Sequence, residues 1–190
     1  PFEHRRPPGR GEIHTLPSPL LGGAAVFTSA EYRQGAGLHL ASVLLRALSR
    51  LDPRWGGLPD ENSPTLQKSA LGGPCLHLGD REGPSLSFSH AEGRLWAAMS
   101  GAGGVGIDAA FSEEFADGYP LARAFRKEEL DCAGVLCRGE TARGAALLWA
   151  VKEASVKATG VGFNLLDPLE VRVGPPLGGE QGILFEVMAD

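Results

Sequence analysis

The stretch 141–159 constrains the fold most, because it is a long run of helix-favouring residues that closes on a glycine. Gly160 is the expected C-terminal stop, where a helix turns into left-handed backbone. Three side chains in the run recur four residues apart and therefore share one stripe of the helix: Trp149, Glu153 and Lys157. A different, apolar face is expected to contact the core: Leu147, Val151, Ala154 and Ala158.

Glu153 and Lys157 have two interpretations at this point. The simpler one is a surface ion pair, which contributes about 0.2–0.5 kcal/mol. The alternative is a site that presents an acid and a base to one ligand. Asp108, at the end of the run Val105-Gly106-Ile107-Asp108, could bring a second carboxylate to the same point, although alone it also suits a turn or a cap. Two carboxylates and a lysine would suit a metal-bound phosphate ester.

Composition and charge limit the class of protein. With 190 residues the chain forms one large domain or two small halves, and its 43% hydrophobic and 22% charged residues are ordinary for a globular protein. Its 27 glycines and 14 prolines predict many turns. The net charge of -5 argues against a generic nucleic-acid binder, which needs a basic surface.

Cysteine usage points to a reducing compartment. The three cysteines, Cys75, Cys132 and Cys137, cannot all pair within one chain, and the absence of a CxxC motif argues against a zinc cage. Reduced thiols and a cytoplasmic location are the expected state. No apolar run approaches the roughly 20 residues that span a bilayer, so no membrane segment is expected.

The order of periodic segments predicts an α+β fold, with strands and helices in each half. The first half is expected to contain a strand at 24–28, a helix at about 30–49, a loop at 52–65, a hairpin of 84–90 with 94–100, and a third strand at 105–109. The second half is expected to contain short helices at 120–125 and from 128, the long helix at 141–159, and a hairpin of 169–173 with 183–187. The glycine-rich run 101–104 suggests three parts: an extended or mobile arm at 1–19, an N-terminal half at 20–103 and a C-terminal half at 104–190.

Upstream of Asp108, the pair Ser89-His90 ends an alternating strand. His90 is either an ordinary hydrogen-bonded histidine or a donor to a phosphate. A Ser/His/Asp triad is not supported, because no G-x-S-x-G elbow surrounds any serine. Gly72-Gly73-Pro74 reads as a turn.

The order and spacing of these signals resemble the 4'-phosphopantetheinyl transferase superfamily. Its two shared motifs, (V/I)-G-(I/V)-D and (F/W)-x-x-K-E-(A/S)-x-x-K, are matched by 105–108 and by 149–157, which includes Lys152. Phe125 and Glu129 resemble the F-x-x-x-E segment between them. Ser89-His90 and Gly72-Gly73-Pro74 resemble the Ser-His strand and Gly-Lys-Pro turn of the larger, monomeric, surfactin-synthetase-activating branch.

That resemblance implies two similar α+β halves related by a pseudo-twofold axis, with the site between them. It implies an enzyme that transfers 4'-phosphopantetheine from coenzyme A to a serine of an acyl or peptidyl carrier protein, with Mg²⁺ as cofactor and adenosine 3',5'-bisphosphate as the other product. The chain would act as a monomer, without nucleic-acid or membrane partners.

The same resemblance implies a role for each candidate residue. Asp108 and Glu153 would hold Mg²⁺, and both would belong to the catalytic set together with Lys157. Glu153, or water beside it, would take the proton from the carrier serine. Coenzyme A would be bound by five residues: Ser89, His90, Gly72, Pro74 and Lys157.

Three departures from the family pattern leave an alternative open. Ala110 stands where the larger branch usually has a glutamate, Gly73 replaces the lysine of the Gly-Lys-Pro turn, and the arginine near the start of the first-half helix has no clear counterpart. A diverged, non-catalytic module that binds coenzyme A or a carrier protein is therefore the second hypothesis, and an interaction protein with neither ligand is the third.

Overall fold

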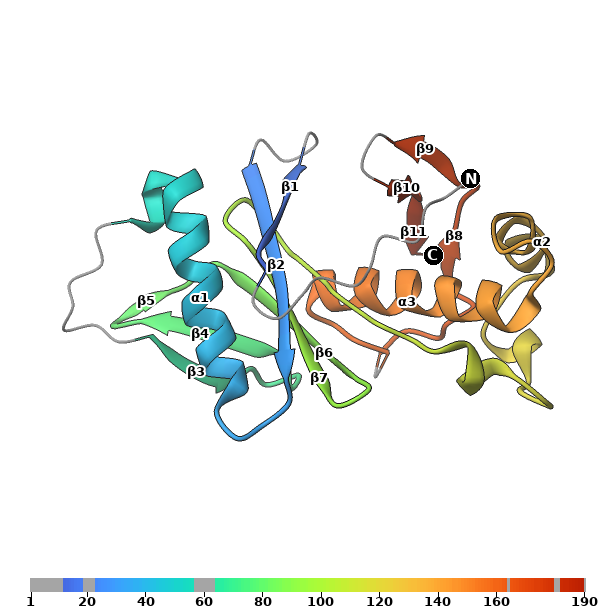
Figure 1. Cartoon of the computed structure of the whole chain (residues 1–190), viewed down its shortest axis with the longest axis horizontal. Coiled ribbons are helices and arrows are strands. Elements are labelled where there is room, and N and C mark those ends of the chain that lie inside the picture. Colours follow the sequence, from blue (N-terminus) through green and yellow to red (C-terminus); the bar gives the residue numbers. More distant parts are fainter. Residues whose placement is uncertain (1–11, 19–22, 57–63, 164, 180–181, 190) are drawn as a thin grey trace. The chain divides into compact units, whose positions relative to one another are not determined.

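The computed structural model describes residues 12–18, 23–56, 64–163, 165–179 and 182–189, and it divides the chain into two compact units, 1–107 and 108–190 (Figure 1). Among the described residues, three α-helices combine with antiparallel sheets, so the fold is α+β. The pseudo-twofold relation and the bounds 20–103 and 104–190 stay predictions. Residues 1–11 and 19 of the predicted arm lie outside the described residues. No helix in the described ranges has the length and apolar character needed to cross a membrane.

Unit 1 is built on a four-stranded antiparallel sheet in the order β1-β2-β7-β6. Its strands are β1 (His14–Ser18), β2 (Gly23–Glu31), β6 (Ser85–Ala91) and β7 (Arg94–Ser100). The predicted hairpin of 84–90 with 94–100 is confirmed, since β6 pairs with β7 across a two-residue turn at Glu92 and Gly93. The predicted strand at 24–28 is the middle of β2, which continues to Glu31.

Helix α1 (Ala36–Leu51) packs against β2 and β7. The prediction began this helix at about residue 30, but the chain is still in β2 there. Gly35, with φ 79°, makes the left-handed turn from which the helix begins. The buried face of α1 follows helical spacing and supplies much of the core of unit 1: Leu40, Ala41, Leu44, Leu45 and Leu48.

A second sheet in unit 1, in the order β3-β4-β5, was not predicted. It consists of β3 (Thr65–Lys68), β4 (Pro74–Leu78) and β5 (Arg81–Glu82). Leu76 and Leu78 of β4 alternate with exposed or half-buried neighbours and join the core.

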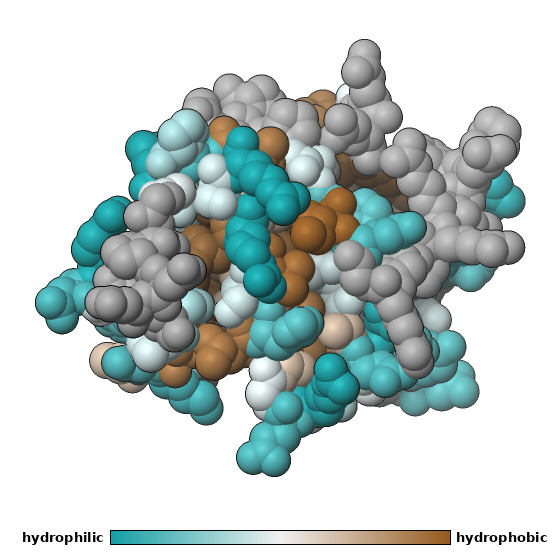
Figure 2. All heavy atoms as spheres, turned by 60° about the vertical axis from the view of Figure 1, so that its left-hand side comes forward, coloured by the Kyte–Doolittle hydropathy of each residue, from teal (hydrophilic) through white to brown (hydrophobic). Residues whose placement is uncertain are grey.

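On the face shown in Figure 2, hydrophobic side chains lie among hydrophilic ones. The exposed large apolar residues of this unit, such as Leu51 and Leu71, are normal for a protein surface when single.

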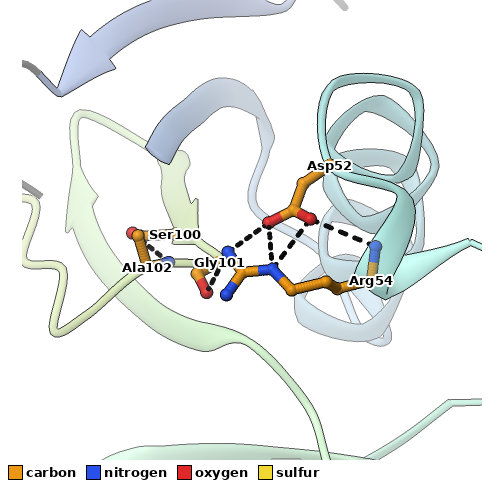
Figure 3. A network of polar contacts seen from close by, with 5 residues as sticks. All are labelled: Asp52, Arg54, Ser100, Gly101 and Ala102. Carbon is orange, nitrogen blue, oxygen red and sulfur yellow. Dashed lines mark hydrogen bonds and ion pairs between the residues drawn. The ribbon is translucent and has the colours of Figure 1, made fainter. Parts of the chain in front are cut away.

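The predicted loop at 52–65 contains a short 3₁₀ turn, η1 (Pro53–Trp55), while residues 57–63 lie outside the described residues. Asp52 caps this turn: its carboxylate accepts hydrogen bonds from the backbone N–H and the guanidinium of Arg54 (Figure 3). The same guanidinium donates to the carbonyl of Gly101 at 3.4 Å. A Cβ at residue 101 would lie too close to Trp55 Nε1, so glycine is required there.

The predicted strand at 105–109 is wrong, because these residues carry no strand pairing. The physical reason is visible in their hydrogen bonds. The N–H groups of Val105 and Ile107 donate to the hydroxyls of Ser85 and Ser87, at 3.0 and 3.1 Å. Side-chain oxygens therefore take the place that backbone carbonyls have in a β-ladder.

Unit 2 is organised around α3 (Thr141–Thr159), whose bounds match the prediction and whose C-cap Gly160 has φ 77°. Around it lie η2 (Ser112–Phe115), η3 (Leu121–Arg123) and α2 (Lys127–Leu136), of which α2 and η2 pack directly on α3. The predicted core face of α3 is correct only in part: Val151 packs against the core of unit 2, and all four residues, Leu147, Val151, Ala154 and Ala158, are half-buried. The most deeply buried side chains of the helix are Ala145, Leu148, Lys152 and Val156.

The last residues of unit 2 form two small hairpins. Strand β8 (Val171–Val173) pairs with β11 (Val187–Ala189), and β9 (Leu177–Gly179) pairs with β10 (Gly182–Leu184). The predicted pairing of 169–173 with 183–187 is therefore wrong in register. Phe185 lies between β10 and β11 and packs toward the core of the unit, which interrupts the predicted strand.

Candidate functional site

Helix α3 positions two of the candidate residues. Glu153 and Lys157 lie one turn apart, and Lys157 Nζ is 3.2 Å from Glu153 Oε1. Both side chains are partly accessible, at 31% and 25%. Trp149, one turn earlier on the same stripe, packs into an aromatic group with Phe115, Phe125 and Phe163. The stripe therefore begins in the core of unit 2 and ends at a partly solvated ion pair.

Asp108 completes this group. Its Oδ1 lies 2.7 Å from Lys157 Nζ, and its side chain is 6% exposed. One ammonium thus bridges two carboxylates that are 45 residues apart in sequence. The structure brings the three predicted catalytic residues together inside unit 2. The group carries one excess negative charge when all three residues are ionised.

The donor chemistry of this group fits a small hard cation. Mg²⁺ typically binds through one or two carboxylates and takes its remaining ligands from water and phosphate oxygens. Asp108 and Glu153 supply two carboxylates, and a cation already lies between them in the form of Lys157. Across the described ranges, no group of three or more His, Cys, Asp and Glu residues could hold a metal. Any metal here would thus depend on additional ligands from substrate or water.

Ala110, two residues after Asp108, supplies no third acid to this group. It is half-buried and packs against the core of unit 2. An apolar methyl group in a packed position contributes no charge to the site. The run 105–110 therefore supplies one carboxylate to the site, that of Asp108, and α3 supplies another, that of Glu153.

A second charged pair, Lys152 with Glu129, lies next to the site and is buried. The side chain of Lys152 is 0% exposed, and its Nζ is 2.9 Å from Glu129 Oε2. The same ammonium donates to the carbonyls of Ala124 at 3.0 Å and Pro168 at 2.9 Å. Burial lowers the pKa of Lys152, and the bond to Glu129 opposes that shift.

Glu129 joins this pair to the rest of unit 2. Its Oε1 accepts the backbone N–H of Val173 in β8, and its Oε2 accepts the N–H of Arg126 at the start of α2, both at 2.8 Å. One buried ion pair therefore ties α3 to α2, to β8 and to the turn before β8. Sequence reasoning assigned no role to Lys152. The burial of Lys152 can be predicted from its position in the helix. Leu148 and Val156, four residues before and after it, are apolar and place Lys152 on the buried stripe.

The four remaining candidates belong to unit 1. Ser89 is buried in β6, whereas His90 is exposed and its ring lies 4.3 Å from that of Tyr32. Gly72, with φ 86°, forms the turn between β3 and β4, and Pro74 is the first residue of β4. The predicted turn at 72–74 is confirmed in part: Gly72 N–H donates to the carbonyl of Ser69, but Pro74 already belongs to the strand.

Comparison with known families matches the second part of the chain. Residues 104–185 match the model of the 4'-phosphopantetheinyl transferase superfamily, and this match supports the superfamily assignment. The matched segment contains Asp108, Glu129, Lys152, Glu153 and Lys157. Because that superfamily consists of transferases, the match also supports phosphopantetheinyl transfer in general. No curated protein matches the chain.

Proposed function

We propose that the chain transfers 4'-phosphopantetheine from coenzyme A to a serine of an acyl or peptidyl carrier protein, with Mg²⁺ as cofactor. The observation that carries the proposal is the group of Asp108, Glu153 and Lys157 within a segment that matches the superfamily. The three unpaired cysteines agree with a reducing compartment such as the cytoplasm. The surfactin-synthetase-activating branch is the subtype that the motifs of unit 1 favour.

In this reaction the hydroxyl oxygen of the carrier serine bonds to the phosphorus that carries the pantetheine arm. The bond from that phosphorus to the bridging oxygen breaks, and adenosine 3',5'-bisphosphate leaves with the electron pair. The serine proton passes to a base. Glu153 is the better placed base of the two carboxylates, because its side chain is 31% exposed, against 6% for Asp108.

Lys157 and the two carboxylates divide the remaining work. Asp108 and Glu153 would hold Mg²⁺, which when bound offsets charge on the pyrophosphate. Lys157 would donate to phosphate oxygens, because its partly exposed ammonium can contact a ligand. His90, Ser89, Gly72 and Pro74 are proposed to bind coenzyme A.

The test is mass spectrometry of a panel of apo carrier proteins incubated with the chain, coenzyme A and Mg²⁺. The wild-type chain should add one phosphopantetheine to at least one carrier. Glu153→Ala should lower kcat by roughly 10²–10⁴-fold, the range for loss of a general base. Glu114→Ala is the matched control, because Glu114 is an exposed glutamate of η2 in the same unit. Activity that survives in the Glu153 variant at the control level would refute this mechanism.

Two positions favour a second function. Ala110 stands where the larger branch usually has a glutamate, and Gly73 stands where it has a lysine. The chain would then bind coenzyme A or a carrier protein without turnover. Calorimetry that shows coenzyme A binding, with no transfer to any carrier in the panel, would support this alternative. Turnover by the wild-type chain eliminates it.

A further inference from the structure

Strand β6 carries serine at every second position, and these serines lie on one face of the four-stranded sheet. Ser85, Ser87 and Ser89 pair with Ser100, Ala98 and Trp96 of β7. The residues between them, Leu86 and Phe88, face the other way and pack in the core beneath α1. Ser87 is 3% exposed, so its hydroxyl is a buried polar group that needs a partner.

The partners of two of these serines are backbone groups of the segment that leads to Asp108. Val105 N–H donates to Ser85 Oγ at 3.0 Å, and Ile107 N–H donates to Ser87 Oγ at 3.1 Å. Both the serines and the amides are spaced by two residues, so the two bonds run in register along β6. A hydroxyl can accept one such bond and still donate its own proton elsewhere.

Two bonds at this spacing fix both the position and the twist of the backbone from 105 to 107. Asp108 follows Ile107 directly, and its carboxylate lies 2.7 Å from Lys157. A displaced backbone at Ile107 would move the Cα of the next residue and thereby its carboxylate. The effect reaches the candidate site through the covalent chain and requires no contact of either serine with substrate.

We propose that Ser87, assisted by Ser85, is a positioning residue that holds the backbone before Asp108 and thereby aims its carboxylate. Its role in transfer rests on the proposed function, whereas the hydrogen bond itself can be measured without any substrate. A β-branched hydroxyl should serve as well as serine, and a methyl group should not.

The first measurement is amide hydrogen exchange of the ¹⁵N-labelled full chain by NMR. In Ser87→Ala the Ile107 amide should exchange several-fold faster than in the wild type, up to about tenfold, because it loses an acceptor. Ser87→Thr should restore the wild-type rate. Ser49→Ala is the matched control, since Ser49 belongs to unit 1 and its hydroxyl donates to a carbonyl of its own helix. An unchanged Ile107 rate in Ser87→Ala would overturn the proposal.

The second measurement is the transfer assay on the same variants. Ser87→Ala should lower kcat/KM by roughly ten- to hundredfold, the scale expected for a misplaced catalytic group. Ser87→Thr should recover most of it, and Ser49→Ala should match the wild type. If the wild type is active and Ser87→Ala equals it, the positioning role is wrong and the proposed function stands. If the wild type itself transfers nothing, the proposed function fails, and with it the role in transfer.

Discussion

The buried pair of Lys152 and Glu129 shows how a charged residue can belong to a core. Isolated charges are costly to bury, and they persist where partners satisfy them. Lys152 has Glu129 and two carbonyls within 3.0 Å, while Glu129 accepts two backbone N–H groups in addition. The adjacent Glu153 and Lys157 are partly exposed and hold a looser arrangement. The neighbouring residues Lys152 and Glu153 thus have separate roles: Lys152 stabilises the core, whereas Glu153 lies at the surface.

Lys152→Met tests the structural duty. The change leaves Glu129 buried without its cation, and breaking a buried pair in this way typically costs about 3–5 kcal/mol of unfolding free energy. Urea denaturation monitored by circular dichroism measures this loss. Lys127→Met is the matched control, because Lys127 pairs with Asp131 on the surface of α2, where an ion pair contributes about 0–1 kcal/mol. Equal stability of the two variants would contradict the proposed contribution of the buried pair.

At the scale of single residues, the sequence predicts the group of Asp108, Glu153 and Lys157, but it does not predict the buried pair of Lys152 and Glu129. Asp108, Glu153 and Lys157 were selected by motif, and the structure places them together. Lys152 stood in the same motif without a role. The reason is physical: a charged residue is expected at the surface, and only the apolar neighbours at 148 and 156 reveal the buried stripe.

At the scale of elements, the turn η1 has an electrostatic cap that can be tested by pH. The guanidinium of Arg54 holds the pKa of Asp52 below its ordinary value of 3.8, chiefly through their side-chain hydrogen bonds. A carboxyl whose pKa is lowered in the folded state stabilises the fold at pH values above its ordinary pKa of 3.8. This contribution is lost as the pH falls through the folded-state pKa. The cap should therefore persist in mild acid.

Carboxyl ¹³C titration by NMR checks this expectation. In the wild type Asp52 should titrate below 3.8, and in Arg54→Ala its pKa should return toward that value. Arg50→Ala serves as the control, because Arg50 is an exposed arginine in the last turn of α1. An Asp52 pKa that does not respond to the loss of Arg54 would show that the ion pair in Figure 3 does not form in solution.

The elements that sequence predicted well are those with strong local signals. Helix α3 ends at a glycine, and in the β6–β7 hairpin strand β6 alternates Leu86 and Phe88 with serines before a tight turn. Long-range pairing was less predictable. The partner of β8 is β11, so of the predicted partner segment 183–187 Val187 alone pairs with β8, because the chain between the two strands forms its own hairpin. The run 105–109 has the composition of a strand, but serine hydroxyls take its N–H groups.

At the scale of the whole molecule, the chain consists of two α+β units of unequal design. Unit 1 contains a four-stranded and a three-stranded sheet, whereas the described part of unit 2 contains two-stranded hairpins beside α2 and α3. The α+β class followed from the mixed order of strand and helix patterns. The three strands β3–β5 were missed because each is short, although Leu76 and Leu78 carry the alternation of a half-buried strand.

The oligomeric state of the chain tests the proposed subtype. The resemblance to the larger branch leads us to expect a monomer, with a mass of 19.9 kDa. Light scattering at a low and a high protein concentration should give this mass at both. A particle of two or three times this mass would contradict the proposed membership of the larger, monomeric branch. A globular protein of known mass, run alongside, would calibrate the mass scale.

The position of Lys157 between Asp108 and Glu153 has a final consequence. Two carboxylates held near each other repel. Here the chain provides its own counter-ion from the next turn of the same helix. Loading of the site would then be an ion exchange, in which the ammonium yields its place and becomes available to the incoming anion. Lys157 would thus neutralise the two carboxylates before the substrate binds and would bind the substrate's phosphate afterwards.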